Sequence, residues 1–234
     1  MLCKIADLFV EIPEDENIEA LVTEYKASEM AEADIVISAE RYRYQNYPSG
    51  SRQSVAYNES GAQFYSRLLY FGGMMLHASA VELDGRAYLF SGPSGVGKST
   101  HTALWQRQFP NAVVFNDDKP ALRNIDGRWF AYGTPWSGKN HLNTNIKVPL
   151  AGVCFLRRDT QNSIRKLFGI EAVSRLVQQT MHALCKIERL DFMLRCVEDI
   201  ISHIPIYELS ALPNAQAARL THDTMLLGAK EAGL

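Results

Sequence analysis

The stretch Gly92 to Ser99, GPSGVGKS, is the feature that most constrains the fold of this chain. It matches the pattern G-x-x-x-x-G-K-[ST] at every position, which predicts a loop whose backbone N–H groups curl around phosphate oxygens. An apolar run, Arg86 to Phe90, precedes the loop, and an amphipathic run from Gly97 to Gln108 follows it. A strand before and a helix after are the context that this pattern requires. We therefore expect an α/β fold built around a strand–loop–helix unit.

The residues of this loop predict a nucleotide site. The positive N-terminal end of the following helix favours a phosphate group. The ammonium of Lys98 can reach the β- and γ-phosphates, and the Ser99 hydroxyl can ligate magnesium. The predicted cofactors are ATP, or another nucleoside triphosphate, and Mg²⁺. The predicted binding residues are Gly92, Pro93, Ser94, Gly95, Val96, Gly97, Lys98, Ser99 and Thr100.

Two adjacent carboxylates, Asp117 and Asp118, follow the apolar run Ala112 to Asn116. Carboxylates at the end of a buried strand need a partner, a metal or a role. One helix and one turn separate Lys98 from Asp117, so we expect this strand to lie beside the loop strand. Its carboxyl end would then be level with the phosphates. One carboxylate can hold the metal, and the other can accept a proton from an attacking hydroxyl.

Two Asp-Gly pairs predict tight hairpins and, through them, further site residues. A two-residue turn at Asp84-Gly85 places His77 opposite Gly92, at the mouth of the phosphate loop. A similar turn at Asp126-Gly127 brings Pro135 and Trp136 near the acid pair, so the segment 133–139 returns to it. This register adds His77 and Lys139 as site residues. Two hairpins around one strand–loop–helix unit also predict a mixed sheet.

Phosphoryl transfer concentrates negative charge, so further cations are expected beside Lys98. The candidates are Lys139, Arg157 and Arg158. Lys139 ranks first, because the hairpin register brings its segment to the aspartates. One of the two arginines is expected to face outward, because neighbouring residues of a strand point to opposite faces.

The first seventy residues have a less regular pattern of apolar runs than the rest of the chain. They contain short strand-like runs, Ile5 to Ile12, Asp34 to Ser38 and Ser54 to Tyr57, and a turn at Tyr47 to Gly50. The string RYRYQNYP, residues 41–48, is interpreted as a half-buried strand rather than a nucleic-acid platform. We expect residues 1–70 to form an N-terminal extension or subdomain and residues 71–234 to form the P-loop kinase domain.

The remaining elements are predicted from hydrophobic periodicity and from the residues that typically start and end helices and strands. We expect a short helix in 63–71 that ends at Gly72-Gly73. Strands are expected in 74–83, 86–90, 121–125, 129–132, 151–157 and 204–209. Two helices are expected at 170–184 and 188–203, and Asn214 is expected to cap a last helix.

Bulk properties exclude several classes of protein. The formal net charge of −2 and the pI of about 6.3 give no broad attraction to nucleic acid or to anionic membranes. No close cysteine pair occurs among Cys3, Cys154, Cys185 and Cys196, so free thiols in a reducing compartment are expected. The N-terminus turns acidic too soon for a signal peptide, and no apolar run is long enough to span a membrane. We expect a soluble cytoplasmic protein; homo-oligomerisation stays open.

The residues LHASAV, the phosphate loop and FNDD together resemble the catalytic domain of HPr kinase/phosphorylase. That family is related in fold to ATP-dependent phosphoenolpyruvate carboxykinase. The segment 149–159 resembles its next core strand, and 204–220 resembles the closing strand and helix of related kinases, including kinases that modify ribosomal peptides. The resemblance covers about 73–225. It implies a mixed-sheet P-loop kinase core of this type, with a small N-terminal extension.

The resemblance implies a serine kinase that moves the γ-phosphoryl group to a hydroxyl of a protein or peptide. It implies Asp117 as the base and Asp118, with Ser99, as part of the magnesium site. The chain also departs from the family. The glycine-rich signature after the acid pair is replaced by GTPWSGKNHLNTN, residues 133–145. The acceptor therefore stays open between another protein, a peptide and a small hydroxyl compound.

Two other functions fit the same motifs. A small-metabolite hydroxyl kinase also carries acidic residues after the phosphate-loop helix, but it would have an all-parallel sheet, against which the hairpins argue. A non-catalytic nucleotide-binding module would not need Lys98, Ser99, Asp117 and Asp118 together. A guanine-reading N-K-x-D element is absent from the sequence, and the choice of base is otherwise open.

Overall fold

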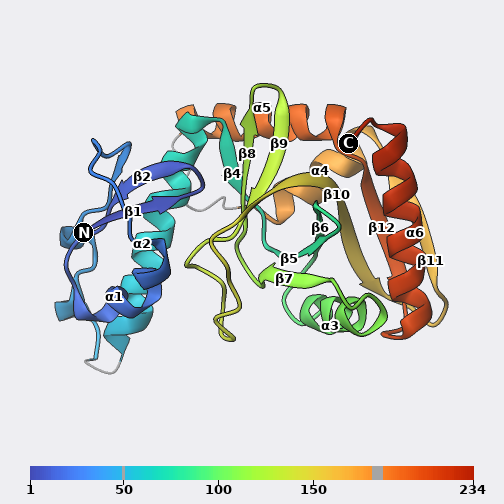
Figure 1. Ribbon diagram of the computed structural model, residues 1–234, viewed down its shortest axis with the longest axis horizontal. Coiled ribbons are helices and arrows are strands. Elements are labelled where there is room, and N and C mark those ends of the chain that lie inside the picture. Colours follow the sequence, from blue (N-terminus) through green and yellow to red (C-terminus); the bar gives the residue numbers. More distant parts are fainter. Residues whose placement is uncertain (49–50, 181–186) are drawn as a thin grey trace.

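The computed structural model describes residues 1–48, 51–180 and 187–234 (Figure 1). Two sheets are present in this part of the chain: a small N-terminal sheet of three strands and a mixed sheet of nine. None of the helices described has both the length and the apolarity that crossing a membrane would require.

The large sheet is ordered β4-β8-β9-β10-β6-β5-β7, with β12 beside β10 and β11 beside β12. Its strands are β4 (Gly73–Met75), β5 (Ala78–Leu83), β6 (Arg86–Ser91), β7 (Val113–Asn116), β8 (Ala121–Ile125), β9 (Arg128–Tyr132), β10 (Lys147–Arg158), β11 (Ser163–Leu167) and β12 (Ile206–Ala211). The long strand β10 runs antiparallel to β9 at its start and parallel to β6 and β12 further along. The expected mixed α/β sheet is confirmed.

Helices cover both faces of this sheet. On one face, α3 (Lys98–Gln108) and α6 (Ala215–Glu231) pack through Trp105, Ala218 and Met225 against side chains such as Phe90. On the other face, α4 (Gly169–Gln178) and α5 (Ile187–His203) pack through Leu176 and Ile200. Each face thus has its own apolar cluster, and α3, the helix that follows the glycine-rich loop, packs in the first of them.

Both predicted hairpins are confirmed in register. Ala78 pairs with Ser91 across β5 and β6, and Ala121 pairs with Tyr132 across β8 and β9. In each turn both central residues have positive φ: 50° and 76° at Asp84-Gly85, and 51° and 81° at Asp126-Gly127. This is the turn geometry that Asp-Gly favours in two-residue hairpins.

Two expectations about the central strands are wrong. The run 74–83 is not one strand, because the chain changes neighbours at Leu76-His77: β4 pairs with β8, whereas β5 pairs with β6 and β7. The strand that leads to the acid pair, β7, does not lie beside the loop strand β6. The returning hairpin strand β5 occupies that place. Because β6 and β7 are both antiparallel to β5, their carboxyl ends still reach the same edge.

The N-terminal part contains β1 (Leu2–Ile5), β2 (Leu8–Glu11), β3 (Ile35–Val36), α1 (Glu16–Val22) and α2 (Arg52–Leu68), with 3₁₀ turns η1 (Thr23–Tyr25), η2 (Ala39–Arg41), η3 (Tyr44–Asn46) and η5 (Leu69–Phe71). The strand expected at 54–57 is wrong, since these residues begin the long helix α2. The strand expected at 41–48 is also wrong, since 3₁₀ turns form there and bury Tyr42. In both segments burial against the rest of the chain outweighs local propensity.

The first strands and α2 share one apolar cluster with the large sheet. This cluster contains Val10 and Phe64 from the N-terminal part, together with Ala121, Tyr132 and Trp136. Through this cluster, α1 and α2 pack beside the segment that follows β9 (Figure 1). The division predicted at residue 70 stays a prediction.

Other boundaries agree in part with the sequence. Helix α2 is longer than the short one expected, and it gives way after η5 to Gly72, with a positive φ of 66°. The Asn214 cap is confirmed, because its side chain accepts a hydrogen bond from the Ala217 N–H. Strand β11 was not predicted from the sequence. The expected helix end near Leu184, the end of the Tyr47–Gly50 turn and Cys185 lie outside the described residues. Cys3, Cys154 and Cys196 are free and buried.

Candidate functional site

The glycine-rich loop 92–97 connects β6 to α3, so the sequence-predicted strand–loop–helix unit is present. Gly95 has a φ of 77° and Gly97 a φ of 116°. Only glycine adopts such values without strain. The loop therefore turns tightly enough to place the first turn of α3, with its unpaired N–H groups, at the edge of the sheet.

Lys98 lies at the start of α3 and is buried. Its Nζ donates to the carbonyl oxygens of Gly92, at 2.9 Å, and of Pro93, at 3.4 Å. Burial lowers the pKa of Lys98, and the negative charges of Asp118 and Asp117 oppose that shift. The ammonium is thus held between the loop and the two carboxylates.

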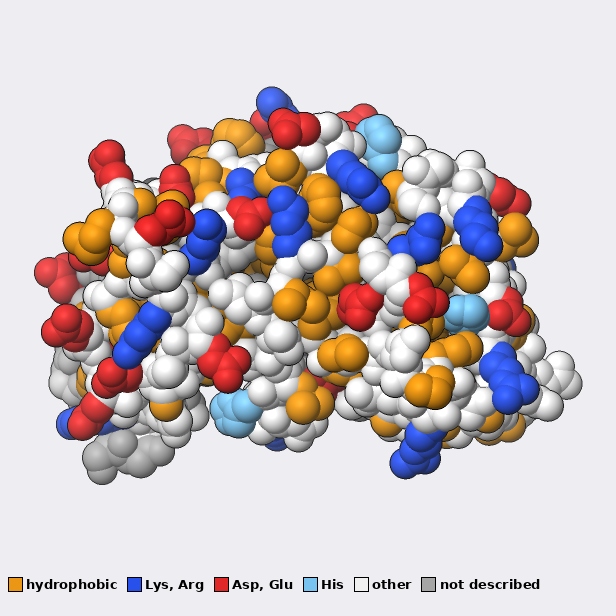
Figure 2. All heavy atoms as spheres, viewed as in Figure 1, with side chains coloured by type: hydrophobic (Ala, Val, Ile, Leu, Met, Phe, Trp, Pro, Cys, Tyr) orange, Lys and Arg blue, Asp and Glu red, His pale blue; other side chains and the backbone are white. Residues whose placement is uncertain are grey.

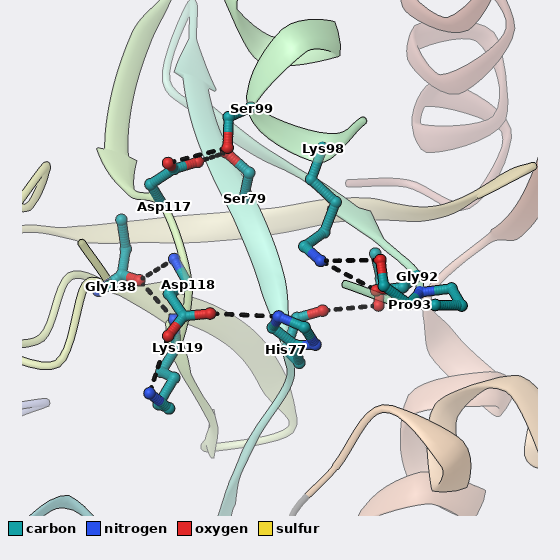
Figure 3. Close-up of polar contacts among 12 residues, drawn as sticks. His77, Ser79, Gly92, Pro93, Lys98, Ser99, Asp117, Asp118, Lys119 and Gly138 are labelled. Atoms are coloured by element: carbon teal, nitrogen blue, oxygen red, sulfur yellow. Dashed lines mark hydrogen bonds and ion pairs between the residues drawn. The ribbon is translucent and has the colours of Figure 1, made fainter. Parts of the chain in front are cut away.

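Asp117 follows β7 and accepts hydrogen bonds from three side chains; two of the donors, Ser79 and Ser99, are labelled in Figure 3. The hydroxyl of Ser79 donates to its Oδ1 at 2.7 Å, and the hydroxyl of Ser99 donates to its Oδ2 at 3.0 Å. The amide of Asn140 reaches the same Oδ2 at 3.4 Å. The last residue of the phosphate-loop motif therefore contacts the first residue of the acid pair.

Asp118 has a different environment (Figure 3). Its Oδ1 lies 3.2 Å from His77 Nε2, and its Oδ2 lies 2.8 Å from Lys119 Nζ. Burial raises its pKa, but the hydrogen bonds and charges of His77 and Lys119 outweigh burial and lower the pKa to about 2. Asp118 is therefore ionised at neutral pH.

The segment after β9 returns to the acid pair, as the hairpin register predicts, but by other residues. Gly138 has a φ of 78°, and a Cβ there would lie 2.9 Å from the Asp118 Cβ. The backbone N–H of Gly138 donates to the Tyr57 hydroxyl, which also accepts from Lys119 Nζ. Trp136 is instead fully buried in the N-terminal cluster. The predicted register fails beyond Tyr132 because strand pairing stops there.

These residues surround one cleft of about 510 Å³. The sequence-predicted residues that line it are His77, Ser94, Gly95, Gly97, Lys98, Ser99, Thr100, Asp117, Asp118 and Lys139. Gly92 and Pro93 adjoin it through the carbonyls that bind Lys98. Val96 lies on the far side of the loop, where it lines a neighbouring hollow.

Several residues of the cleft were missed or ranked low from the sequence. Ser79 could have been found, because it comes two residues after His77 within the strand expected at 74–83, and alternate residues of a strand share a face. Lys119 follows the acid pair directly. Arg158 lines the cleft and donates to the Gly95 carbonyl at 2.6 Å, whereas Arg157 pairs with Asp159. No local signal marked Tyr57, since its contacts depend on how α2 packs.

Two further hollows adjoin the cleft. One, of about 270 Å³, shares Gly97, Thr100 and Arg158 with it and has apolar walls that include Leu156 and Leu209. The other, of about 350 Å³, shares Asp118, Gly138 and Lys139 with it. The glycine-rich loop and the acid pair thus line a cleft that shares lining residues with two neighbouring hollows.

The oxygen donors of the cleft suit Mg²⁺ in combination with phosphate. Ser99 and Asp117 supply a hydroxyl and a carboxylate side by side, and Mg²⁺ prefers oxygen ligands and keeps several waters. Within 1–48, 51–180 and 187–234, no cluster of three or more His, Cys, Asp or Glu side chains could hold a metal by itself.

Part of the chain matches a known protein family. The model described as "SynChlorMet cassette protein ScmC" matches residues 45–212, which include the loop, the acid pair and Gly138. The curated proteins contain no match. Among solved structures, the chain is similar to the Hpr(Ser) kinase/phosphatase from Coxiella burnetii, at 12% sequence identity and a TM-score of 0.38. That similarity covers 67% of this chain and 95% of the other.

Proposed function

We propose that this chain, which belongs to the SynChlorMet cassette protein ScmC family, is a Mg²⁺-dependent kinase. It moves the γ-phosphoryl group of ATP to a serine hydroxyl of a peptide or protein. The observation that carries the proposal is the Ser99–Asp117 hydrogen bond beside the buried Lys98, with Asp118 held ionised next to it. Phosphoryl transfer needs a phosphate cradle, a metal site and a proton acceptor in this proximity.

In this proposal the nucleotide occupies the cleft and the neighbouring hollow that has apolar walls. The loop amides, the N-terminus of α3 and Lys98 bind the phosphates. The hollow beside Leu156 and Leu209 takes the ribose and base, because its walls are apolar and it shares Thr100 with the cleft. ATP is preferred over GTP on the resemblance to ATP-dependent kinases alone.

Ser99 and Asp117 would hold the magnesium ion together with the phosphate oxygens. The ion neutralises charge that develops on the transferred group. Ser79 fixes the Asp117 carboxylate from the opposite side, through a buried hydroxyl. Lys139 and Arg158, both in the lining of the cleft, add positive charge.

The contacts favour Asp118 as the proton acceptor. Asp118 lines both the phosphate cleft and the hollow on its far side, whereas Asp117 lines the cleft. His77 and Lys119 keep the Asp118 carboxylate ionised and oriented. This assignment exchanges the roles that the family resemblance implies, where Asp117 is the base and Asp118 belongs to the metal site. That earlier assignment stays a prediction, and variants of the two residues distinguish the two.

The sheet topology bears on the alternative functions. The loop strand β6 has an antiparallel neighbour, β5, on one side, which argues against the all-parallel sheet expected of a nucleoside-type metabolite kinase. A non-catalytic nucleotide-binding module has no need for a second carboxylate held ionised beside the phosphates. Both observations favour a serine kinase of the HPr kinase type.

The test is transfer of label from γ-labelled ATP, in the presence of Mg²⁺, to serine-containing peptides and to the proteins of a cell extract. We expect label on a peptide or protein band with the wild type. The Lys98→Ala variant is expected to weaken ATP binding and to lower transfer by a factor on the order of 10²–10³, since it removes a fixed cation from the transferred group. Unlabelled serine peptides and proteins with the wild type, or unchanged transfer with Lys98→Ala, would refute the proposal.

A further inference from the structure

The hollow on the far side of Asp118 has walls from three separate segments of the chain. Helix α1 contributes Asn17 and Leu21, helix α2 contributes Gln53, Ser54 and Asn58, and the segment after β9 contributes His141. Asp118, Gly138 and Lys139 line both this hollow and the cleft that holds the glycine-rich loop. A group bound there lies next to the place proposed for the γ-phosphate.

The polar groups of this hollow are mostly uncharged. Asn17, Gln53 and Asn58 carry amides, and Ser54 and Tyr57 carry hydroxyls. An amide offers a donor and an acceptor together, which complements the alternating N–H and C=O groups of a peptide backbone. Asp118 is the one carboxylate among the lining residues that the structure describes, and His77 and Lys119 already pair with it. The hollow therefore suits a neutral, hydroxyl-bearing part of a peptide.

The surface around α1 is strongly acidic. Residues 1–48 contain eleven Asp and Glu against four Lys and Arg, and many red side chains lie over the β1, β2 and α1 end in Figure 2. Glu14, Glu16 and Glu19 line a larger groove of about 630 Å³, also lined by residues near the N-terminus. A chain that leaves the hollow over α1 meets this acidic surface, so positive charge beside the bound hydroxyl is favoured.

We propose that the hollow between α1, α2 and the segment 138–141 is the acceptor site of the kinase, and that its occupant is a cationic peptide segment bearing a serine. This inference rests on the proposed function and specifies its substrate. The serine oxygen forms a bond to the γ-phosphorus while the bond from that phosphorus to the β–γ bridging oxygen breaks. The hydroxyl proton passes to Asp118, and ADP leaves. The N-terminal residues thereby select the substrate, a role that the phosphate loop cannot fill.

The experiment compares acceptors with γ-labelled ATP and Mg²⁺. The acceptors are one pool of short peptides with a central serine among Lys and Arg residues, one pool with the serine among Asp and Glu residues, and free serine and glycerol. We expect the basic pool to accept label best. In the double variant Gln53→Ala/Asn58→Ala, the KM for that pool is expected to rise about tenfold, since two amide hydrogen bonds are lost. The KM of this double variant for ATP and its kcat are expected to stay at the wild-type values.

Matched variants separate a docking role from a general effect. Gln45→Ala removes an exposed amide in η3 that does not line the hollow, and it is expected to leave the peptide KM unchanged. Glu16→Lys reverses a charge on α1 and is expected to reduce the preference for the basic pool. Glu32→Lys reverses an exposed acidic residue outside the acidic groove and is expected to have a smaller effect.

The outcomes distinguish this inference from the function on which it rests. If the wild type transfers label to no acceptor, the proposed function fails and this inference fails with it. If the wild type labels the basic pool but the Gln53→Ala/Asn58→Ala variant keeps the wild-type peptide KM, the acceptor site lies elsewhere and the kinase proposal stands. Preference for the acidic pool, or for free serine or glycerol, overturns the cationic peptide as the occupant.

Discussion

The Ser99 hydroxyl donates to the Asp117 carboxylate at 3.0 Å, across the gap between the first turn of α3 and the end of β7. The two residues come from separate elements, and β5 lies between the strands that lead to them. Their contact joins the phosphate-loop motif to the acid pair. The neighbouring Asp118 instead contacts His77 and Lys119. The two aspartates of the pair therefore have different contact residues.

Substitutions in the acid pair distinguish the two aspartates. If Asp117 and Ser99 hold magnesium, the Asp117→Asn variant needs a higher Mg²⁺ concentration for half-maximal transfer and binds Mg–ATP more weakly. The Asp118→Asn variant keeps its ATP affinity and Mg²⁺ requirement but loses turnover by a factor on the order of 10²–10⁴, as expected for a lost general base. Titrations of transfer rate against Mg²⁺ and against ATP measure both effects. The opposite pattern would support Asp117 as the base.

The pairs around Asp118 make stability depend on pH. Its pKa falls from the usual 3.8 to about 2 in the folded protein, because His77 and Lys119 outweigh its burial. A lowered pKa means that this contribution is complete above pH 3.8 and is lost as the pH falls towards 2. The shift corresponds to about 2 kcal/mol. Asp118→Asn is therefore expected to lower the free energy of unfolding by about that amount at pH 7.

Denaturant titrations at several pH values test this prediction. The difference in free energy of unfolding between the wild type and Asp118→Asn is expected to shrink between about pH 4 and pH 2. Asp126→Asn, in an exposed hairpin turn, is the matched control. A difference that stays constant over this range would mean that the ion pairs of Asp118 do not stabilise the fold.

Gly138→Ala tests the close approach to Asp118. The change adds a Cβ 2.9 Å from the Asp118 Cβ, at a φ of 78°. We expect it to displace the 138–141 segment and to reduce transfer strongly. Gly127→Ala has a similar φ of 81°, but a Cβ there meets nothing within 4 Å. The Gly127→Ala variant therefore carries the backbone strain alone, which costs about 1–2 kcal/mol, whereas Gly138→Ala carries both the strain and the clash. Equal loss of transfer in the two variants, measured at matched stability, would contradict the close-approach explanation.

Ser79→Ala tests whether the orientation of Asp117 matters. The buried Ser79 hydroxyl donates to Asp117 Oδ1 at 2.7 Å, so its loss frees one side of the carboxylate. A hydrogen bond of about 1 kcal/mol corresponds to a roughly fivefold rise in the Mg²⁺ requirement. Ser60→Ala removes another buried hydroxyl, one that accepts from the Trp136 indole N–H, and neither residue lines the cleft. It is expected to lower stability without changing the Mg²⁺ requirement. An unchanged Mg²⁺ requirement in Ser79→Ala would refute the orienting role.

Local sequence signals determined several parts of this protein. Residues within a few positions of one another determine four features: the loop 92–99, both Asp-Gly hairpins, the mixed character of the sheet and the Asn214 cap. Turn type, glycine geometry and helix capping act over such short distances, so the hairpin register that pairs Ala78 with Ser91 could be predicted. The acid pair was expected beside the loop on the assumption that β7 neighbours β6; β5 lies between them, and the pair reaches the same edge because β6 and β7 are both antiparallel to β5.

Tertiary structure alone decided the rest. The sequence could not show that β5 separates β6 from β7, that Ser54 to Tyr57 lie in α2, or that Tyr57, Lys119 and Gly138 meet beside Asp118. These contacts join residues that lie about sixty to eighty positions apart, as the hydrogen bonds of the Tyr57 hydroxyl show. They form because α2 and the N-terminal strands bury apolar side chains against β8 and β9. Burial depends on the whole packed chain, and it can override local propensity, whereas a turn or a cap depends on its own few residues.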